Sequence, residues 1–217
     1  MRKRKALENP IVSFLRRRGS VVLAQRASAA ETQDVQPRTG SRSGVTALRR
    51  PTSDLHMGDN LIHRLIPHQG CVITRTGDGI DIAGSAMNWV MSAGVVPFTC
   101  KAPFLFRVIG KTDSTNLRMH WHRGELIFNW ECSVRELRVH DPATAEQHGI
   151  KEKGFISTTD WHEIVWEVHL DHLRVIVDGE VRFEAAGDYS GIESAPSVGP
   201  CFGSTVSIRE CYITPIS

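Results

Sequence analysis

The sequence predicts an all-β protein, namely a two-sheet antiparallel jelly-roll sandwich preceded by a disordered, basic N-terminal arm. Three observations lead to this prediction. Short runs of alternating apolar and polar residues recur from Leu61 onwards, turn residues such as Asp178-Gly179 separate the runs, and no long stretch has helical apolar spacing. Roughly a dozen short strands without a real helix are typical of sandwiches and jelly rolls. The predicted strands are Leu61–Ile66, Cys71–Arg75, Gly79–Ala83, Met87–Met91, Phe104–Ile109, Asn116–His122, Glu125–Trp130, Arg135–His140, Phe155–Thr158, His162–Leu170, Leu173–Val177, Glu180–Glu184 and Ser204–Thr214. The one helix-like stretch, Ala143–His148, is predicted to be a connecting loop.

The first 50 residues differ from the rest of the 217-residue chain in charge and in apolar content. They carry a net charge of +9, whereas residues 51–217 carry a net charge of −7. From Ser28 to Ser53 almost no large apolar side chain occurs, so this segment cannot bury enough surface to offset its conformational entropy. We therefore expect a disordered arm over residues 1–55 and one β-sandwich domain over residues 56–217.

The same arm also has features of a leader sequence. Arg16-Arg17-Arg18 precede a short apolar run, and Ala27-Ser28-Ala29 resemble a cleavage site. A solvated tail and a mis-assigned start codon are the alternatives. No uninterrupted apolar run reaches the roughly 18 residues of a membrane-spanning helix, so we expect a soluble protein, and the sequence leaves open whether it is cytoplasmic or exported.

Five cysteines are scattered along the chain without the paired spacing of a metal finger. Most of them fall in predicted strands, where a cysteine commonly behaves as a small buried apolar residue. A single structural disulfide in an exported protein is the alternative.

Strand alternation also predicts where the core lies. Within His162–Leu170, the side chains of Ile164, Trp166 and Val168 share one face, because successive residues of a strand point to opposite sides. The Asp178-Gly179 turn favours a hairpin, since both residues tolerate positive φ. We expect Trp166 to be a core residue.

Three predicted strands, Asn116–His122, Glu125–Trp130 and Arg135–His140, carry many forked or ring-shaped hydrogen-bonding side chains. If these strands are neighbours, the polar side chains share one sheet face. Planar, bidentate groups beside an exposed tryptophan suit a site that orients sugar hydroxyls and stacks on a pyranose ring. The candidate ligand-binding residues are Arg118, His120, His122, Asn129, Trp130, Glu131 and Arg138. An ordinary solvated sheet face has a similar pattern, and both interpretations stay open.

Four segments, Glu125–Trp130, Trp161–Val168, Leu173–Glu180 and Gly203–Ile208, carry a likeness to a known superfamily. With them, the run from Phe98 to Thr214 resembles the concanavalin A-like lectin and glucanase superfamily, especially its laminin-G-like and galectin-like jelly rolls. The resemblance implies a two-sheet jelly roll, whose members include lectins, hydrolases and interaction domains. The His-x-Asn-x-Arg strand of galectins is not intact here, so no residue roles are transferred.

Catalytic and metal-binding motifs are weak in this sequence. The Glu-x-Asp-x-x-Glu strand of laminarinase-type hydrolases is missing, so no catalytic residue is assigned. His120 and His122 lie two positions apart, but two histidines alone do not define a metal site. No cofactor is assigned. Calcium, which some members of the superfamily bind, stays an open alternative, with Thr76–Asp81 and Asp171 as the candidate oxygen donors.

These observations lead to one functional hypothesis and two alternatives. We predict a non-catalytic, lectin-like binding module that recognises a glycan, glycoconjugate or protein on the concave face of one sheet. One alternative is a carbohydrate-active hydrolase of the same fold. The other is an interaction domain that acts through its basic arm. A nucleic-acid partner is not indicated, because no RNA-binding aromatic signature accompanies that arm.

Overall fold

The computed structural model describes residues 57–84 and 93–216, which form sixteen strands and no helix. The predicted disordered arm over residues 1–55 lies outside the described residues, as does the strand predicted over Met87–Met91. Within the described ranges, no helix is present that could cross a membrane. The prediction of an all-β fold is confirmed.

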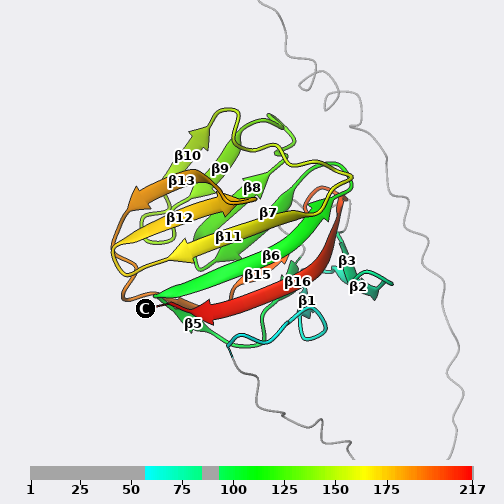
Figure 1. Ribbon diagram of the computed structural model, residues 1–217, viewed down its shortest axis with the longest axis horizontal. Helices are drawn as coiled ribbons and strands as arrows, with labels where there is room; N and C mark the ends of the chain where they lie inside the picture. Colours follow the sequence, from blue (N-terminus) through cyan, green and yellow to red (C-terminus); the bar gives the residue numbers. More distant parts are fainter. Residues whose placement is uncertain (1–56, 85–92, 217) are drawn as a thin grey trace, which may run out of the picture. The chain divides into compact units, whose positions relative to one another are not determined.

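Two seven-stranded antiparallel sheets pack face to face (Figure 1). Sheet A contains, in order, β1 (Ile66–His68), β4 (Ala93–Val95), β15 (Ser197–Gly199), β7 (Leu117–Trp121), β8 (Gly124–Phe128), β9 (Leu137–His140) and β10 (Gln147–Ile150). Sheet B contains β13 (Glu180–Ala186), β12 (His172–Val177), β11 (His162–Val168), β6 (Phe104–Thr112), β16 (Thr205–Pro215), β3 (Ile80–Ala83) and β2 (Val72–Arg75). A two-stranded sheet joins β5 (Cys100–Lys101) to β14 (Glu193–Ser194).

The hairpins follow from local turn chemistry. Asp178 and Gly179 connect β12 to β13 with φ angles of 51° and 81°. A tight turn with two positive φ angles matches the twist of antiparallel strands, and the predicted Asp-Gly hairpin is confirmed. At Gly79, before β3, a Cβ atom would lie 2.1 Å from the carbonyl oxygen of Ile208, so only glycine permits this close approach to β16.

The inward-facing side chains of both sheets form one core. Trp121 of β7 and Trp166 of β11 are fully buried, and the ring centroid of Phe104 lies 5.0 Å from that of Trp121. The indole N–H of Trp121 donates a hydrogen bond to the carbonyl oxygen of Ser194 at 3.1 Å. The prediction that Trp166 is a core residue is confirmed.

All five cysteines are free thiols, and Cys71, Cys100, Cys201 and Cys211 are buried, while Cys132 is exposed. Burial raises the pKa of the Cys100 and Cys211 thiols to about 12. Such thiols stay protonated and unreactive at neutral pH. The expectation that most cysteines act as small buried apolar residues is confirmed.

Three predicted segments differ from the structure. The predicted strand Leu61–Ile66 is a turn up to Leu65, because the N–H groups of Arg64 and Leu65 both donate to the carbonyl oxygen of Leu61, and β1 begins only at Ile66. Phe155–Thr158 is irregular, and the connecting loop predicted over Ala143–His148 runs into the edge strand β10. Short apolar runs do not by themselves fix the backbone conformation.

A buried hydrogen bond ties the end of sheet A to the segment between β13 and β14. The Tyr189 hydroxyl donates to Oδ2 of Asp141 at 2.6 Å, and Oδ1 of Asp141 accepts the N–H groups of Ala143 and Thr144, both at 2.8 Å. Burial opposes ionisation of Asp141, but these hydrogen bonds outweigh it and hold the pKa of the carboxyl below its usual range. Asp141 directly follows His140, so this anchor fixes the end of β9.

Replacing Trp166 should strongly destabilise the protein. We expect Trp166→Ala to lower the free energy of unfolding by about 3–5 kcal/mol, because the ring is fully buried and the cavity cannot be filled by its neighbours. Phe155→Ala is the matched control, since Phe155 is 52% exposed. Chemical denaturation monitored by circular dichroism measures both, and equal midpoints for the two variants would contradict the core assignment.

The anchor between Tyr189 and Asp141 predicts a pH-dependent loss of stability. Tyr189→Phe should cost about 1–3 kcal/mol at pH 7, because a buried carboxylate loses its donor. The pKa of Asp141 is lowered in the folded protein, so this stabilisation is present at neutral pH and is lost as the pH falls through that pKa.

Denaturation of wild type and Tyr189→Phe at several pH values tests this prediction. The difference in the free energy of unfolding between wild type and Tyr189→Phe should be largest at pH 7 and should become smaller at acidic pH. Tyr212→Phe is the control, because Tyr212 is the other of the two tyrosines and lies on the outward face of sheet B. A gap that stays constant with pH would contradict the role of Asp141.

Candidate functional site

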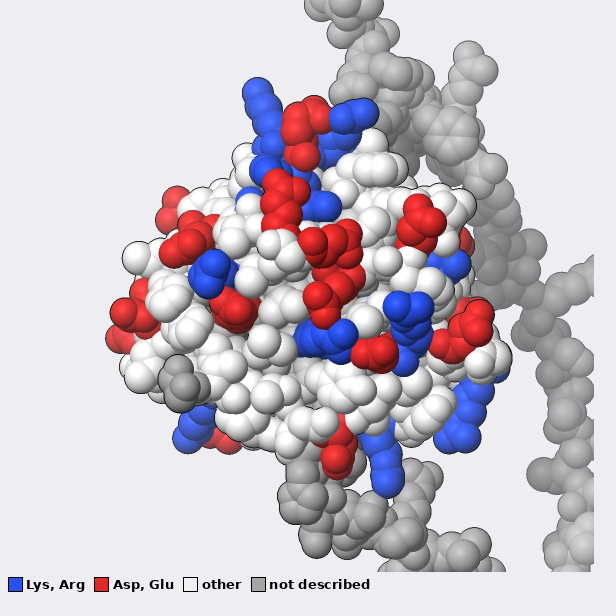
Figure 2. All heavy atoms as spheres, in the orientation of Figure 1, with Lys and Arg blue, Asp and Glu red and all other residues white. Residues whose placement is uncertain are grey.

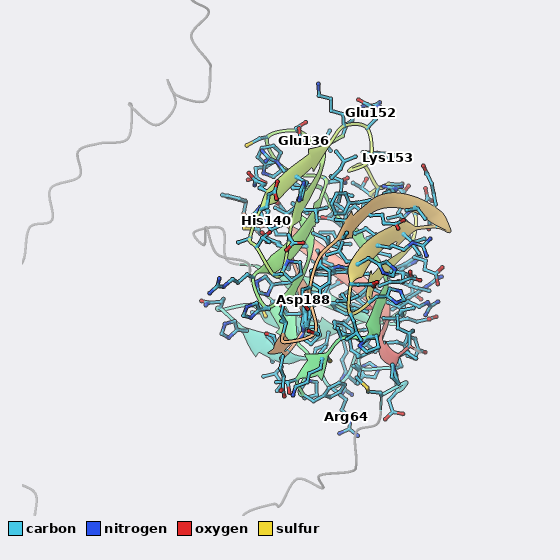
Figure 3. All side chains as sticks on the ribbon, turned by 90° about the vertical axis from the view of Figure 1, so that its left-hand side faces the viewer. Arg64, Glu136, His140, Glu152, Lys153 and Asp188 are labelled. Carbon is cyan, nitrogen blue, oxygen red and sulfur yellow. The ribbon has the colours of Figure 1, made fainter. Side chains whose placement is uncertain are left out.

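The candidate site lies on the face of sheet A that points away from sheet B. The inward positions of β7, β8 and β9 are fully buried apolar residues, so the alternate positions point outward. Two neighbouring rows of side chains occupy this face: His120, Glu125, His140 and Gln147 in one row, and Arg118, Ile127 and Arg138 in the next. Figure 3 shows His140 on this side of the sheet. Strands β7, β8 and β9 are therefore neighbours, which is the condition on which a shared polar face depended.

Arg118 is the centre of a hydrogen-bond network on this face. Its Nε and Nη2 atoms donate to Oδ1 of Asn116 at 3.1 and 2.7 Å, and its Nη1 donates to Oε1 of Glu125 at 3.1 Å. Nη2 also lies 3.5 Å from Oε2 of Glu131. The residue is only 8% exposed. Because the guanidinium fork is planar and rigid, it fixes the positions of the three acceptors around it.

Arg138 and Trp130 form a second unit beside this network. The guanidinium carbon of Arg138 lies 3.8 Å from the centroid of the Trp130 ring, which is a cation–π contact. Nε of Arg138 lies 2.9 Å from Oε1 of Glu136. One face of the indole ring is therefore covered by Arg138, and the Trp130 side chain is partly exposed.

The histidines of the outward row differ in their surroundings. Burial lowers the pKa of His120; attraction to Glu125 opposes this shift, and repulsion from His122 and His140 adds to it, so the ring is neutral at pH 7. Nε2 of His140 lies 2.7 Å from the amide nitrogen of Gln147, and Nδ1 lies 3.8 Å from Oε2 of Glu125. The amide is a donor, so Nε2 accepts and the proton of a neutral His140 lies on Nδ1, toward Glu125.

His122 lies at the end of β7 and not on its face. Strand β7 stops at Trp121, and His122 has a φ of 56° in the turn that leads to β8. Its side chain is exposed at the rim of the sheet. The predicted strand over Asn116–His122 is therefore one residue too long at each end.

Asn129 is a structural residue, and its sequence-based placement on the solvent face is wrong. The side chain is fully buried: Nδ2 donates to the carbonyl oxygen of Ile156 at 2.9 Å, and Oδ1 accepts the N–H of Ile156 at 2.8 Å. The Asn129 amide therefore pairs with the backbone of Ile156 as a neighbouring strand would, because the segment around Ile156 belongs to no sheet. The φ of Asn129 is 48°, so its side chain does not follow the alternation of inward and outward positions in β8.

Sequence analysis missed Phe202 as a neighbour of the site. Its ring centroid lies 5.9 Å from the guanidinium carbon of Arg118, and the residue is 37% exposed. The signal that could have found it is the Phe202-Gly203 pair in the short connection between β15 and β16, since a large apolar residue is uncommon in an exposed turn.

No metal centre is formed by the described residues, since none of their His, Cys, Asp and Glu side chains gather in a group of three or more that could hold an ion. Asp81 accepts a hydrogen bond from the Ser207 hydroxyl at 2.7 Å, and Asp171 lies 2.7 Å from Nδ1 of His172. These two candidate calcium donors therefore have protein partners at separate places in the fold.

The outward face of sheet B differs from that of sheet A. Figure 2 shows acidic and basic side chains interleaved over this face. Arg107 contacts Glu163 at 2.5 Å and Glu210 at 2.7 Å, and these side chains are 27–42% exposed, whereas Arg118 and Glu125 on sheet A are 10% and 14% exposed. Exposed pairs are screened by water and contribute little. The charged groups of sheet A are thus held more firmly than those of sheet B.

No protein-family model matches this chain, and the search of curated proteins found no match. Among solved structures, the carbohydrate-binding module CBM66 from Bacillus subtilis aligns with a TM-score of 0.51 and 9% sequence identity, over 69% of this chain and 94% of that chain. The cellulose-induced protein Cip1 aligns with a TM-score of 0.49 and 9% identity, over 69% and 88% of the two chains. A double variant of human galectin-16 gives 0.45 and 11% identity, over 60% and 100%.

The described part of the chain has the two-sheet jelly-roll fold that the sequence resemblance implied. The likeness to CBM66 at 9% identity establishes the fold and does not transfer an activity. The activity must therefore be argued from the side chains of the outward face of sheet A.

The placement of Asn129 predicts a stability defect. Asn129→Ala should lower the free energy of unfolding by about 1–3 kcal/mol, because the buried N–H and C=O groups of Ile156 lose their partner. Gln147→Ala is the control, since Gln147 is exposed on the edge strand β10. Urea denaturation measures both variants. An Asn129→Ala variant as stable as wild type would contradict the structural role of Asn129.

Proposed function

We propose that this protein is a binding module for a glycan or glycoconjugate, and that its site is the outward face of sheet A. One observation carries the proposal: Arg118 is almost fully buried on a face that points away from the core, and it fixes Asn116, Glu125 and Glu131 around one guanidinium. A face that only meets water gains little from such fixed polar groups.

The physical reason is preorganisation. A sugar presents several hydroxyl groups in a rigid pattern, and each hydroxyl needs both a donor and an acceptor. Flexible Glu and Arg side chains would lose rotamer entropy when they bind such a ligand, and this loss lowers affinity. Here the network around Arg118 and the contact between Arg138 and Trp130 have already restricted those side chains.

The residues of the site have different roles in this proposal. Glu131, Arg138 and His140 are the groups for direct hydrogen bonds, because their side chains are 28%, 20% and 30% exposed within the network. Arg118 and Trp130 position Glu131 and Arg138, respectively. His120 adds a neutral ring on β7, and His122 lies at the rim.

The fold agrees with this proposal. The carbohydrate-binding module CBM66, which has the same fold, is named for binding carbohydrate. We also propose that residues 56–217 are one independently folding domain, since Pro51–Ser217 belong to one compact unit.

A carbohydrate-active hydrolase of the same fold is the second candidate, and one observation favours it. Glu125 and Glu131 both lie within 3.5 Å of the guanidinium of Arg118, so two carboxylates are close together on one face. Hydrolysis of a glycosidic bond commonly uses such a pair. Release of reducing ends from a bound oligosaccharide, abolished in Glu125→Gln, would favour this candidate over a pure binding module.

Binding measurements on variants of the full chain test the proposed site. A glycan array identifies a ligand, and Glu131→Gln and Arg138→Ala should then weaken its binding by about ten- to a hundred-fold, because each change removes a hydrogen bond worth about 1–3 kcal/mol. The thermal midpoint should change little, since both side chains are partly exposed.

Glu163→Gln is the matched control, because Glu163 pairs with an arginine on the opposite sheet face. If a ligand is identified and both Glu131→Gln and Arg138→Ala bind it with wild-type affinity, the site does not lie on the outward face of sheet A. Arg118→Ala cannot separate binding from folding, since it leaves Glu125 and Asn116 without their donor.

A further inference from the structure

Two cationic side chains and an indole ring lie together on the outward face of sheet B, apart from the candidate site on sheet A. Nζ of Lys111 in β6 lies 5.0 Å from the centroid of the Trp161 ring, and the guanidinium carbon of Arg209 in β16 lies 5.3 Å from it. Trp161 directly precedes β11, which pairs with β6. The ring therefore brings together cations from two neighbouring strands, and a neutral indole attracts each cation without cancelling its charge.

A β-bulge sets the position of Arg209. The register between β16 and β6 shifts between Ile208 and Glu210, so Arg209 opposes no residue of β6. A bulge re-aims a side chain, and bulges are enriched next to functional sites. A Cβ atom at Gly79 would lie 2.8 Å from Cα of Arg209. The turn between β2 and β3 therefore packs closely against the bulge and restricts the backbone of Arg209.

Neither cation has a counter-charge in the part of the chain that the structure describes. Lys111 donates one hydrogen bond there, to the carbonyl oxygen of Thr159 at 3.3 Å, and forms no ion pair with a described residue. Arg209 is exposed, and none of its N–H donors has an acceptor among the described residues. Asp160, next to Trp161 in the chain, is exposed and pairs with neither cation. Most N–H donors of the two cations are therefore unpaired.

The carboxylates of the neighbouring strands have other partners. Glu163 of β11 and Glu210 of β16 both pair with Arg107, at 2.5 and 2.7 Å. Asp81 of β3 accepts a hydrogen bond from the Ser207 hydroxyl at 2.7 Å. An anionic ligand can therefore approach the indole and its cations without displacing any of these contacts.

The two cations also define the class of ligand. A guanidinium presents a planar fork of donors that matches an oxyanion, and an ammonium group adds a point charge. Two cations match one oxyanion group, whereas a protein that binds along a nucleic-acid backbone uses a longer row of them. Residues 51–217 carry a net charge of −7, so this part of the chain repels an extended polyanion.

From the unpaired cations, the shared ring and the bulge, we propose that Lys111, Arg209 and Trp161 form a binding site for a single oxyanion group, either carried by an acidic sugar or free as an inorganic anion. Arg209 binds the oxyanion through its fork, Lys111 adds the second charge, and Trp161 holds both cations beside its ring. The site lies on the sheet opposite to the proposed glycan-binding face, so it goes beyond the proposed function and does not depend on it.

A titration of the isotopically labelled full chain, followed by NMR, tests the site. The probes are a sulfated glucose, glucuronate and inorganic sulfate, with glucose as the neutral probe. We expect the anionic probes to shift the signals of the Trp161 indole N–H and the Arg209 backbone N–H in a saturable way, and glucose to leave both signals unchanged. Added salt should weaken the binding, because it screens the attraction between exposed charges.

Three variants separate this site from a general effect of charge. Arg209→Gln should weaken binding of the anionic probes about tenfold, because it removes both the charge and the fork. Arg209→Lys should retain more of the affinity, because it keeps the charge and loses only the fork. Arg135→Gln is the matched control: it removes the same charge from a side chain that is 70% exposed and pairs with Glu152.

Saturable shifts with the anionic probes that are weakened in Arg209→Gln and kept in Arg135→Gln support the site. Tighter binding of the sulfated glucose than of inorganic sulfate then assigns the site to an acidic sugar, and equal binding assigns it to a free anion. The absence of saturable shifts, an equal response to glucose, or an equal loss in Arg135→Gln would overturn the proposal. None of these outcomes bears on glycan binding by sheet A, because they are measured at Trp161 and at residue 209 of sheet B.

Discussion

The packing of two sheets face to face is the constraint on which the rest of this structure depends. Trp121 and Trp166 fill the space between the sheets, so every second residue of the central strands must be apolar and inward. The remaining residues of β7, β8 and β9 must then point to the outward face of sheet A. The candidate site on sheet A lies where three neighbouring strands place their outward positions side by side, and all of those positions except Ile127 are charged or ring-bearing.

Much of this arrangement could be predicted from the sequence, and its limits have a physical cause. Alternation placed Trp166 inward and Arg118, His120 and Arg138 outward, because each lies inside a regular strand. Alternation fails where a residue adopts positive φ, since the next side chain then no longer follows the period of two. Short strands such as β4 and β15 were missed because three residues carry too little pattern.

Three residues with positive φ lie before, within and after the hairpin of β7 and β8. They explain the errors in the sequence-based placement of the site residues. Asn116, His122 and Asn129 have φ angles of 59°, 56° and 48°. Asn116 turns its amide toward Arg118, and Asn129 turns its amide toward Ile156, so one asparagine supports the network and the other supports a loop. Sequence alone cannot separate these two uses, because both depend on partners that the fold brings from elsewhere.

The network around Arg118 fits the proposed binding function better than a role in stability alone. Taking charged groups out of water costs free energy that their attraction recovers only in part, and apolar side chains of similar size would cover a sheet face at least as well. Glu125 and Glu131 share one guanidinium, so neither carboxylate has all of its acceptor positions filled by Arg118. Under the proposed function, the remaining acceptor positions bind a ligand that has several donors in a fixed pattern, such as the hydroxyl groups of a sugar. A network built only to close the surface would leave fewer acceptors in reach of solvent.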